Sequence, residues 1–360
     1  MGNSQINSTI RDWDYRKNLV KQFVSDSTID KYVFGCNTLG KQISDQIEVT
    51  GFVDDLISNK FFHGKPVVRS SEIPSQSIVV SAIVGVLPVT VERHLDALGV
   101  AHVDYFIFLM ESGLNLGPIP FWGDAHGDMV ENSSTYASLL QLMGDEISKQ
   151  SLQDFINFRT KLDLRYMEKY TDRQSEQYFE DFLNLDRSGL NFFDLGCYDG
   201  YTSNKFAHLS PQYNSISAFE PIPRLFEDSS RNLRELRDCT VYNYGASAQH
   251  FHTKFRDAGS SSSESNSGDI EVELRRLDDQ ELPEPHLIKV DIEGSEIVAL
   301  QGMREAITKS KPMMAIACYH YPSEVIEITK FWASLGLSGK MYFRHYTEGT
   351  TETVLFLCPE

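Results

Sequence analysis

The sequence predicts an α/β protein with two open, doubly wound sheets. The stretch 191–202, N-F-F-D-L-G-C-Y-D-G-Y-T, has an apolar run that ends in an acid, then a turn with two glycines, then a helical pattern. The stretch 216–221, I-S-A-F-E-P, is typical of a second strand and ends near Glu220. A similar strand-to-glycine signal, K-Y-V-F-G-C-N-T-L-G, lies at 31–40. Because ligands bind at the carboxyl ends of parallel strands, we expect a binding edge on each sheet.

The second glycine loop favours S-adenosylmethionine (SAM) over a dinucleotide. Asp194 precedes the first glycine, and a carboxylate on the rim would repel a pyrophosphate, which needs bare backbone amides. SAM instead carries an ammonium, a sulfonium and no phosphate. Glycine allows the backbone to approach a ligand closely, and Glu220 is placed to bind a ribose diol. The predicted cofactor contacts here are Asp194, Gly196, Cys197, Tyr198, Asp199, Gly200, Thr202, Glu220, Pro221, Gly245 and Ala246.

Composition narrows the class of protein. The 360 residues suggest roughly two domains, and the net charge of −18 argues against a nucleic-acid partner. No apolar run approaches the ~20 residues that span a bilayer, and the polar start predicts no signal peptide, so we expect no membrane insertion. Five cysteines without paired spacing predict reduced thiols in a cytoplasm. Neither C-x-x-C nor H-E-x-x-H occurs, so no zinc motif is indicated.

A helical lead-in at 1–30 and a small Rossmann-like domain at 31–112 are predicted first. A helix at 91–98 should stop at Gly99 as a C-cap. The first expected strand opens the strand-to-glycine stretch 31–40, and further strands are expected at 49–55, 66–68, 77–84 and 105–109. With F-G-x-x-x-x-G and G-F-x-D-D, the domain resembles the small Rossmann modules that precede sugar-modifying catalytic domains, some of which bind a nucleotide-sugar. A docking domain without a ligand stays open as the alternative.

A loop and helical connector is predicted at 113–185. Its glycine- and proline-rich first part, 111–132, is typical of a loop, and the rest has helical spacing. The stretch 174–182, Q-S-E-Q-Y-F-E-D-F, predicts a lead-in helix that can fold over a bound cofactor. Gln177 and Tyr178 are its candidate cofactor contacts, and burial in a packed core is the alternative.

The last domain, 186–360, contains the remaining strands. Two alternating segments flank a serine-rich run at 258–268, which is either a flexible loop or a lid over the site. The last strand is expected to run antiparallel to its neighbour and to close the sheet. The expected strands after Glu220 are 241–245, 251–255, 270–277, 287–292, 312–319, 340–346 and 352–358.

Several motifs of this last domain together resemble the FkbM family of SAM-dependent methyltransferases. They are D-L-G-C-Y-D-G at 194–200, A-F-E-P at 218–221, L-D-D at 277–279, K-V-D-I-E-G-S-E at 289–296, and the later K-P and A-C-Y-H. The resemblance runs from about Tyr166 to the last residue, and K-V-D-I-E-G-S-E is its most specific block. It implies a class I methyltransferase sheet of seven strands, the last antiparallel, and O-methylation, commonly of a sugar or glycan hydroxyl.

The chemistry of such a reaction is predicted at three strand ends. Asp291, His320 and His345 should share one rim, where a histidine near neutral pKa can take the hydroxyl proton. His320 is the predicted general base, with Asp291 or His345 assisting. Glu293 is a further catalytic candidate, although a helix N-terminus also favours an acid there. Asp291 is a cofactor candidate too, and any metal ion would be held by Asp291, His320 and His345.

The predicted function is therefore a SAM-dependent O-methyltransferase that modifies a sugar, glycan or nucleotide-sugar in polysaccharide or natural-product biosynthesis. A divalent cation is allowed but not expected, and a homodimer stays open. One alternative is a nucleotide-sugar or NAD-binding enzyme that uses the first domain. The other is a non-catalytic binding protein of methyltransferase fold.

Overall fold

The computed structural model describes residues 13–256, 263–264 and 268–360, so most of the predicted lid lies outside the described residues. The chain forms two compact units that alternate along the sequence, whereas the predicted domains followed one another. Unit 1 comprises Met1–Val130, Gln153–Arg173 and Tyr346–Thr351, and unit 2 comprises Glu131–Leu152, Gln174–His345 and Glu352–Glu360.

Unit 1 contains a six-stranded sheet in the order β3-β4-β2-β1-β5-β6. All neighbours are parallel except the β3–β4 pair. Its central strands are fully buried, as expected when helices cover both faces. The strands are β1 (Lys31–Phe34), β2 (Gly51–Val53), β3 (Phe61–Phe62), β4 (Lys65–Val68), β5 (Ile78–Ser81) and β6 (Ala101–Val103).

The helices of unit 1 are α2 (Trp13–Ser25), α3 (Thr38–Ser44), α4 (Pro88–Leu98), α5 (Tyr105–Glu111) and α6 (Ala125–Glu131), with 3₁₀ turns at Ser70–Glu72 and Leu164–Met167. The helix α8 (Glu146–Lys161) begins in a segment of unit 2 and ends in a segment of unit 1. The predicted C-cap is present, since Gly99 has a φ of 68°. Two predictions are wrong. The run 105–109 is a helix, because Asp104 caps the amides of Phe106 and Ile107, and the predicted loop 111–132 contains α6.

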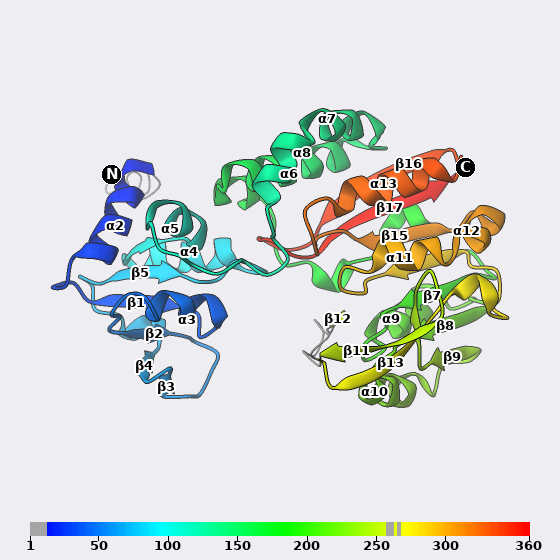
Figure 1. The fold of residues 1–360 in the computed structure, drawn as a ribbon, viewed down its shortest axis with the longest axis horizontal. Coiled ribbons are helices and arrows are strands. Elements are labelled where there is room, and N and C mark those ends of the chain that lie inside the picture. Colours follow the sequence, from blue (N-terminus) through cyan, green and yellow to red (C-terminus); the bar gives the residue numbers. More distant parts are fainter. Residues whose placement is uncertain (1–12, 257–262, 265–267) are drawn as a thin grey trace. The chain divides into compact units, whose positions relative to one another are not determined.

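Unit 2 contains the predicted seven-stranded sheet, in the order β16-β17-β15-β14-β7-β8-β9 (Figure 1). The last strand, β17, pairs antiparallel with both β15 and β16, which confirms the expected closure. The strands are β7 (Asn191–Leu195), β8 (Ser215–Phe219), β9 (Cys239–Tyr242), β14 (Leu287–Val290), β15 (Met313–Ala317), β16 (Gly339–His345) and β17 (Thr353–Pro359).

Helices alternate with these strands, as a doubly wound sheet requires. They are α7 (Ser133–Leu142), α9 (Tyr201–Leu209), α10 (Pro223–Leu233), α11 (Glu296–Gln301), α12 (Arg304–Ser310) and α13 (Glu324–Ser334), with 3₁₀ turns at Gln174–Glu176, Asp181–Leu183 and Leu277–Asp279. The predicted lead-in helix at 174–182 is wrong, because two short turns stand there and Tyr178 between them has a φ of 71°. No helix in the described part of the chain is long and apolar enough to span a bilayer.

A second, smaller sheet of unit 2 follows the third strand, in the order β10-β13-β11-β12. The two alternating segments predicted from the sequence are its long antiparallel strands. Val272 and Leu274 of β13 pack with Leu225 of α10, so one face of this sheet is apolar and buried. The strands are β10 (Gly245–Ala246), β11 (Phe251–Arg256), β12 (Ser263–Glu264) and β13 (Ile270–Arg275).

Candidate functional site

A pocket lies at the carboxyl ends of β7, β8 and β14 in unit 2, and we call it the strand-end pocket. This is the edge at which an open α/β sheet binds its ligand. Eight residues singled out in the sequence line it: Gly196, Tyr198, Glu220, Pro221, Gly245, Ala246, Asp291 and Glu293.

One wall of this pocket is apolar and was missed by sequence reasoning. It includes Phe219 of β8, together with Phe251, Phe255 and Leu274 from the small sheet. The signal was available, because Phe251 and Phe255 are four residues apart on β11 and therefore point to the same face. The sequence predicted the strand at 251–255 but did not predict that one of its faces lines the pocket.

Glu220 presents its carboxylate to the pocket in a fixed position. Its Oε2 accepts from the amide of Tyr198 at 3.2 Å, and its Oε1 accepts from the amide of Ile222 at 2.9 Å. Burial raises the pKa of Glu220 to about 7, although these amides oppose the rise. Both the protonated and the ionised form of this carboxyl group are therefore populated near neutral pH.

Asp194 does not lie on the loop rim as predicted, because its carboxylate is fully buried. It accepts from Ser203 Oγ at 2.7 Å and lies 3.3 Å from Lys289 Nζ. Lys289 stands opposite Asp194 in the β7–β14 register and donates to the carbonyls of Leu195 and Gly196 at 3.1 and 2.6 Å. A buried charge must be paired, so Asp194 holds the loop from behind instead of facing a ligand.

The other loop residues shape the turn. Gly196 has a φ of 75°, and a Cβ there would lie 2.0 Å from the carbonyl oxygen of Asp291. Gly200 also has a positive φ, and a Cβ there would lie 2.8 Å from the Leu233 side chain. The thiol-bearing side chain of Cys197 is buried in a cluster with Leu233. Seven predicted cofactor contacts, all described, do not line the strand-end pocket: Gln177, Tyr178, Asp194, Cys197, Asp199, Gly200 and Thr202.

His320 lies beneath the pocket among four carboxylates. Its Nε2 is 3.4 Å from Asp291 Oδ1 and 3.8 Å from Glu293 Oε2. Its Nδ1 is 3.3 Å from Glu296 Oε1 and 3.5 Å from Glu324 Oε1. Burial alone would lower the pKa of His320, but the hydrogen bonds to Asp291 and Glu324 and the charge of Glu296 raise it well above its usual value. An imidazolium cannot accept a proton, so this finding opposes the predicted general base.

Asp291 is the other strongly paired group. Tyr178 donates its hydroxyl to Asp291 Oδ2 at 2.6 Å, and Gln177 Nε2 donates to that hydroxyl at 3.0 Å. Burial would raise the pKa of Asp291, but the hydrogen bond from His320 and the charge of Lys289 hold it well below its usual range. Gln177 and Tyr178 therefore orient Asp291 from behind.

Glu293 differs from Asp291 because its oxygens are less well paired. Burial raises the pKa of Glu293 to about 7, against the opposing charge of His320. Its Oε2 is buried and has no hydrogen-bond partner among the described residues. The backbone is held in the left-handed region at Glu293 and Gly294, with φ of 60° and 95°. A positive φ strains Glu293 but not the glycine, and strained residues cluster at functional sites.

His345 takes a different place from the one predicted. Its ring is buried, and Nδ1 lies 2.8 Å from Thr353 Oγ1. The predicted metal set of Asp291, His320 and His345 is therefore not assembled. Glu293 takes the third place, since ligand atoms of Asp291, Glu293 and His320 lie within 4.8 Å of one another.

The glycine loop of unit 1 is closed by its own side chains. Asp54 accepts from the amides of Cys36 and Leu56 at 3.3 and 2.9 Å. Asn37 accepts from the amide of Gly40 and donates to the carbonyl of Ala82, both at 2.9 Å. The Asp54 carboxylate and the loop amides, which a nucleotide would need for binding, are thus already hydrogen-bonded to other protein groups.

Residues 194–348 match the family model described as the methyltransferase FkbM domain. The chain carries an FkbM methyltransferase domain. The crystal structure of an FkbM methyltransferase from Methylobacillus flagellatus KT is similar over 98% of this chain and 97% of that one, with a TM-score of 0.76. At 20% identity this similarity shows the fold, and it extends over both units. The chain is a methyltransferase.

Other solved structures match only part of this chain. Fibrillarin from Aeropyrum pernix, determined with natively bound S-adenosyl-L-methionine, matches 48% of this chain and 68% of its own at 15% identity. The TM-score of this match is 0.31. No curated protein matches the chain.

The buried Asp194–Lys289 pair gives a stability prediction. Lys289→Met should lower the free energy of unfolding by about 3–5 kcal/mol, because it leaves Asp194 buried without a cation. Asp194→Asn combined with Lys289→Met should recover part of that loss. Lys309→Met, at an exposed ion pair with Glu284, is the matched control and should unfold as the native protein does. Denaturant unfolding measures all three, and native stability in Lys289→Met would contradict the role of the pair.

Proposed function

We propose that this methyltransferase binds SAM in the strand-end pocket and methylates a hydroxyl of a sugar, glycan or nucleotide-sugar. The observation that carries the proposal is the pocket's division into an apolar wall and an acidic end that contains Glu220, Asp291 and Glu293. SAM has a matching division, since its adenine presents flat aromatic faces and its ammonium and sulfonium are cationic. Carboxylates that line a pocket favour such a cation over an anion.

The residues present fit this cofactor. The Glu220 carboxylate, held by two backbone amides, would accept hydrogen bonds from the ribose hydroxyls. The apolar wall with Phe219 and Leu274 would contact the adenine. The acidic end with Asp291 would face the positive charge. When bound, SAM supplies a methyl group on a sulfonium, which a nucleophile attacks in line, so the main task of the protein is positioning.

Glu293 is the best-supported proton acceptor. It lines the pocket, its pKa is near the working pH, and one of its oxygens lacks a hydrogen-bond partner among the described residues. Asp291, with its pKa far below its usual range, is the weaker base and remains an anion. His320, as an imidazolium, compensates the two carboxylates and keeps them in place.

The acceptor class is supported by the FkbM resemblance and by the site's chemistry. A sugar hydroxyl is a weak acid, so its methylation benefits from a carboxylate that takes the proton. Neighbouring hydroxyls of a sugar can donate to a second carboxylate, and Asp291 lies close to Glu293. The proposed setting is polysaccharide or natural-product modification in a cytoplasm.

Cofactor binding tests the first part of the proposal. Calorimetry at pH 7.5 should detect binding of SAM to the protein and no binding of NAD. Glu220→Gln should lower the affinity for SAM at least tenfold, because it removes the charged carboxylate that accepts hydrogen bonds from the ribose hydroxyls. Glu227→Gln, at an exposed position on α10, is the control and should bind as the native protein does. Native affinity in Glu220→Gln would exclude this placement of the ribose.

The same group predicts a pH dependence of binding. The pKa of Glu220 is raised to about 7, and the carboxylate is the better acceptor. SAM affinity should therefore rise between pH 6 and pH 8 and level off above. This rise should be absent in Glu220→Gln, and a flat native profile would count against the Glu220 contact.

Turnover tests the proton acceptor. Glu293→Gln should lower the rate by about 10²–10⁴-fold while leaving SAM affinity within about threefold, because the group meets the acceptor hydroxyl. The native rate should rise with pH through about 7, since the deprotonated carboxyl is the active form. Methyl transfer to a panel of sugars and nucleotide-sugars measures both. A Glu293→Gln enzyme that keeps near-native turnover would move the role to another group.

A further inference from the structure

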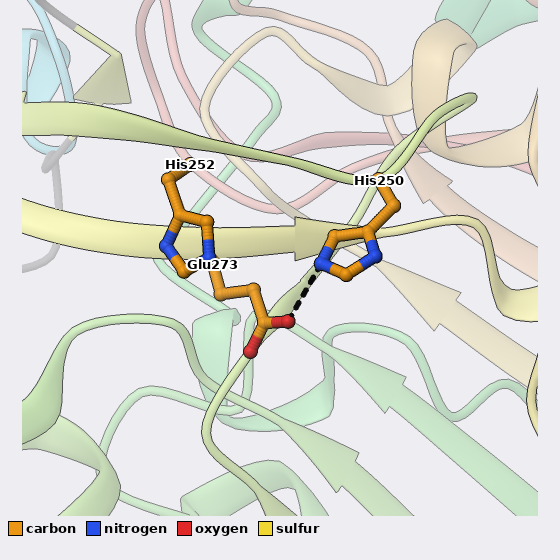
Figure 2. Close-up of side chains that lie close together, drawn as sticks. All are labelled: His250, His252 and Glu273. Atoms are coloured by element: carbon orange, nitrogen blue, oxygen red, sulfur yellow. Dashed lines mark ion pairs between the residues drawn. The ribbon is translucent and has the colours of Figure 1, made fainter.

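Two imidazoles and a carboxylate meet on the outer face of the small sheet, outside the strand-end pocket. His250 immediately precedes β11, His252 lies on it, and Glu273 stands opposite His252 in the β11–β13 register. His250 Nε2 is 2.8 Å from Glu273 Oε1, and one ligand atom from each residue lies within 4.8 Å of the others (Figure 2). These distances need only small side-chain rotations to surround one ion.

The donor set selects a class of metal. Two neutral imidazoles and one carboxylate form a three-ligand set used for Zn²⁺, with water at the fourth position. Imidazole suits zinc, copper and nickel ions, whereas Mg²⁺ and Ca²⁺ prefer sites built from oxygen ligands. The set has no linear motif, because its ligands come from two strands that are joined only in the folded sheet.

The neighbouring charges are compatible with an ion. Arg275 donates to both oxygens of Glu273, at 2.8 and 2.9 Å. A carboxylate offers about four lone-pair sites, so Glu273 can keep Arg275 and still bind a metal. Arg275 then orients the ligand from behind, as outer partners of metal ligands do. Glu271, whose carboxylate is 4.0 Å from His252 Nδ1, adds a second negative charge that balances the guanidinium.

We propose that His250, His252 and Glu273 bind a divalent transition-metal ion, of which Zn²⁺ suits the donors best. The ion joins β11 to β13 from the outside. The inner faces of the same strands carry Phe251, Phe255 and Leu274, which form the apolar wall of the strand-end pocket. An ion at this site therefore stabilises that wall. The effect on the cofactor rests on the proposed function, whereas the metal site does not.

Zinc titration of the full-length, EDTA-treated protein tests the site. Native protein should bind Zn²⁺ by calorimetry, and His250→Ala combined with His252→Ala should lose one site or weaken it at least tenfold. Both rings are 60% exposed, so the double variant should fold normally, which its unfolding profile checks. His208→Ala, at an exposed histidine of α9, should bind as the native protein does. Unchanged zinc binding in the double variant, or none in the native protein, overturns the proposal.

The acidic cluster under the pocket needs its own control. Asp291, Glu293 and His320 could also take up zinc, so Glu293→Gln is titrated in parallel. The site on the small sheet should survive that change. If Glu293→Gln abolishes all zinc binding while the double histidine variant keeps it, the ion belongs to the acidic cluster and the proposal fails.

SAM affinity with and without Zn²⁺ tests the effect on the pocket wall. Native protein should bind SAM about threefold more tightly with zinc, and the double histidine variant should show no difference. Equal affinities in the native protein overturn the coupling alone. Absence of SAM binding under every condition overturns the proposed function and the coupling, while the zinc titration still decides the metal site.

Discussion

The binding edge of this methyltransferase depends on a buried ion pair between neighbouring strands. Asp194 stands opposite Lys289, one residue before the end of its strand, and the Lys289 ammonium also donates to the carbonyls of Leu195 and Gly196. The pair thereby joins β7, β14 and the glycine turn at one point. Gly196 must pass so close to the Asp291 carbonyl that a Cβ would collide with it. Removing two charges from water is costly. The ion pair in return fixes the ends of β7 and β14, from which the adjoining pocket residues follow.

The same cations decide which carboxyl groups near the pocket titrate. Asp291 lies beside Lys289 and His320, so its pKa falls well below the usual range despite burial. Glu220, Glu293 and Glu352 receive less compensation, and burial raises the pKa of each to about 7. Asp291, which has cations beside it, thus serves as a fixed anion. The three glutamates, which have less compensation, change charge near neutral pH. This division separates the positioning role of Asp291 from the proposed proton transfer at Glu293.

Much of the fold could be predicted from the sequence, because local patterns encode it. The glycine turn, the acids at strand ends and the antiparallel last strand all depend on short stretches of chain. The prediction of a strand at 105–109 failed, because a short apolar segment suits a helix and a strand equally until its cap is known. The protonation of His320 could not be predicted, since its partners include Glu296 and Glu324, which two different helices bring together. The orientation of Asp194 depended in the same way on Lys289, which is distant in sequence.

The small sheet shows how one strand pair can serve two surfaces. Side chains alternate along a strand, so residues of β11 and β13 that face the pocket are interleaved with residues that face solvent. Phe251 and Leu274 belong to the inner set, and His252 and Glu273, one residue away on each strand, belong to the outer set. A one-residue register slip would exchange the two faces. Any ligand that fixes the outer pairing therefore also fixes the apolar wall, because both depend on the same register.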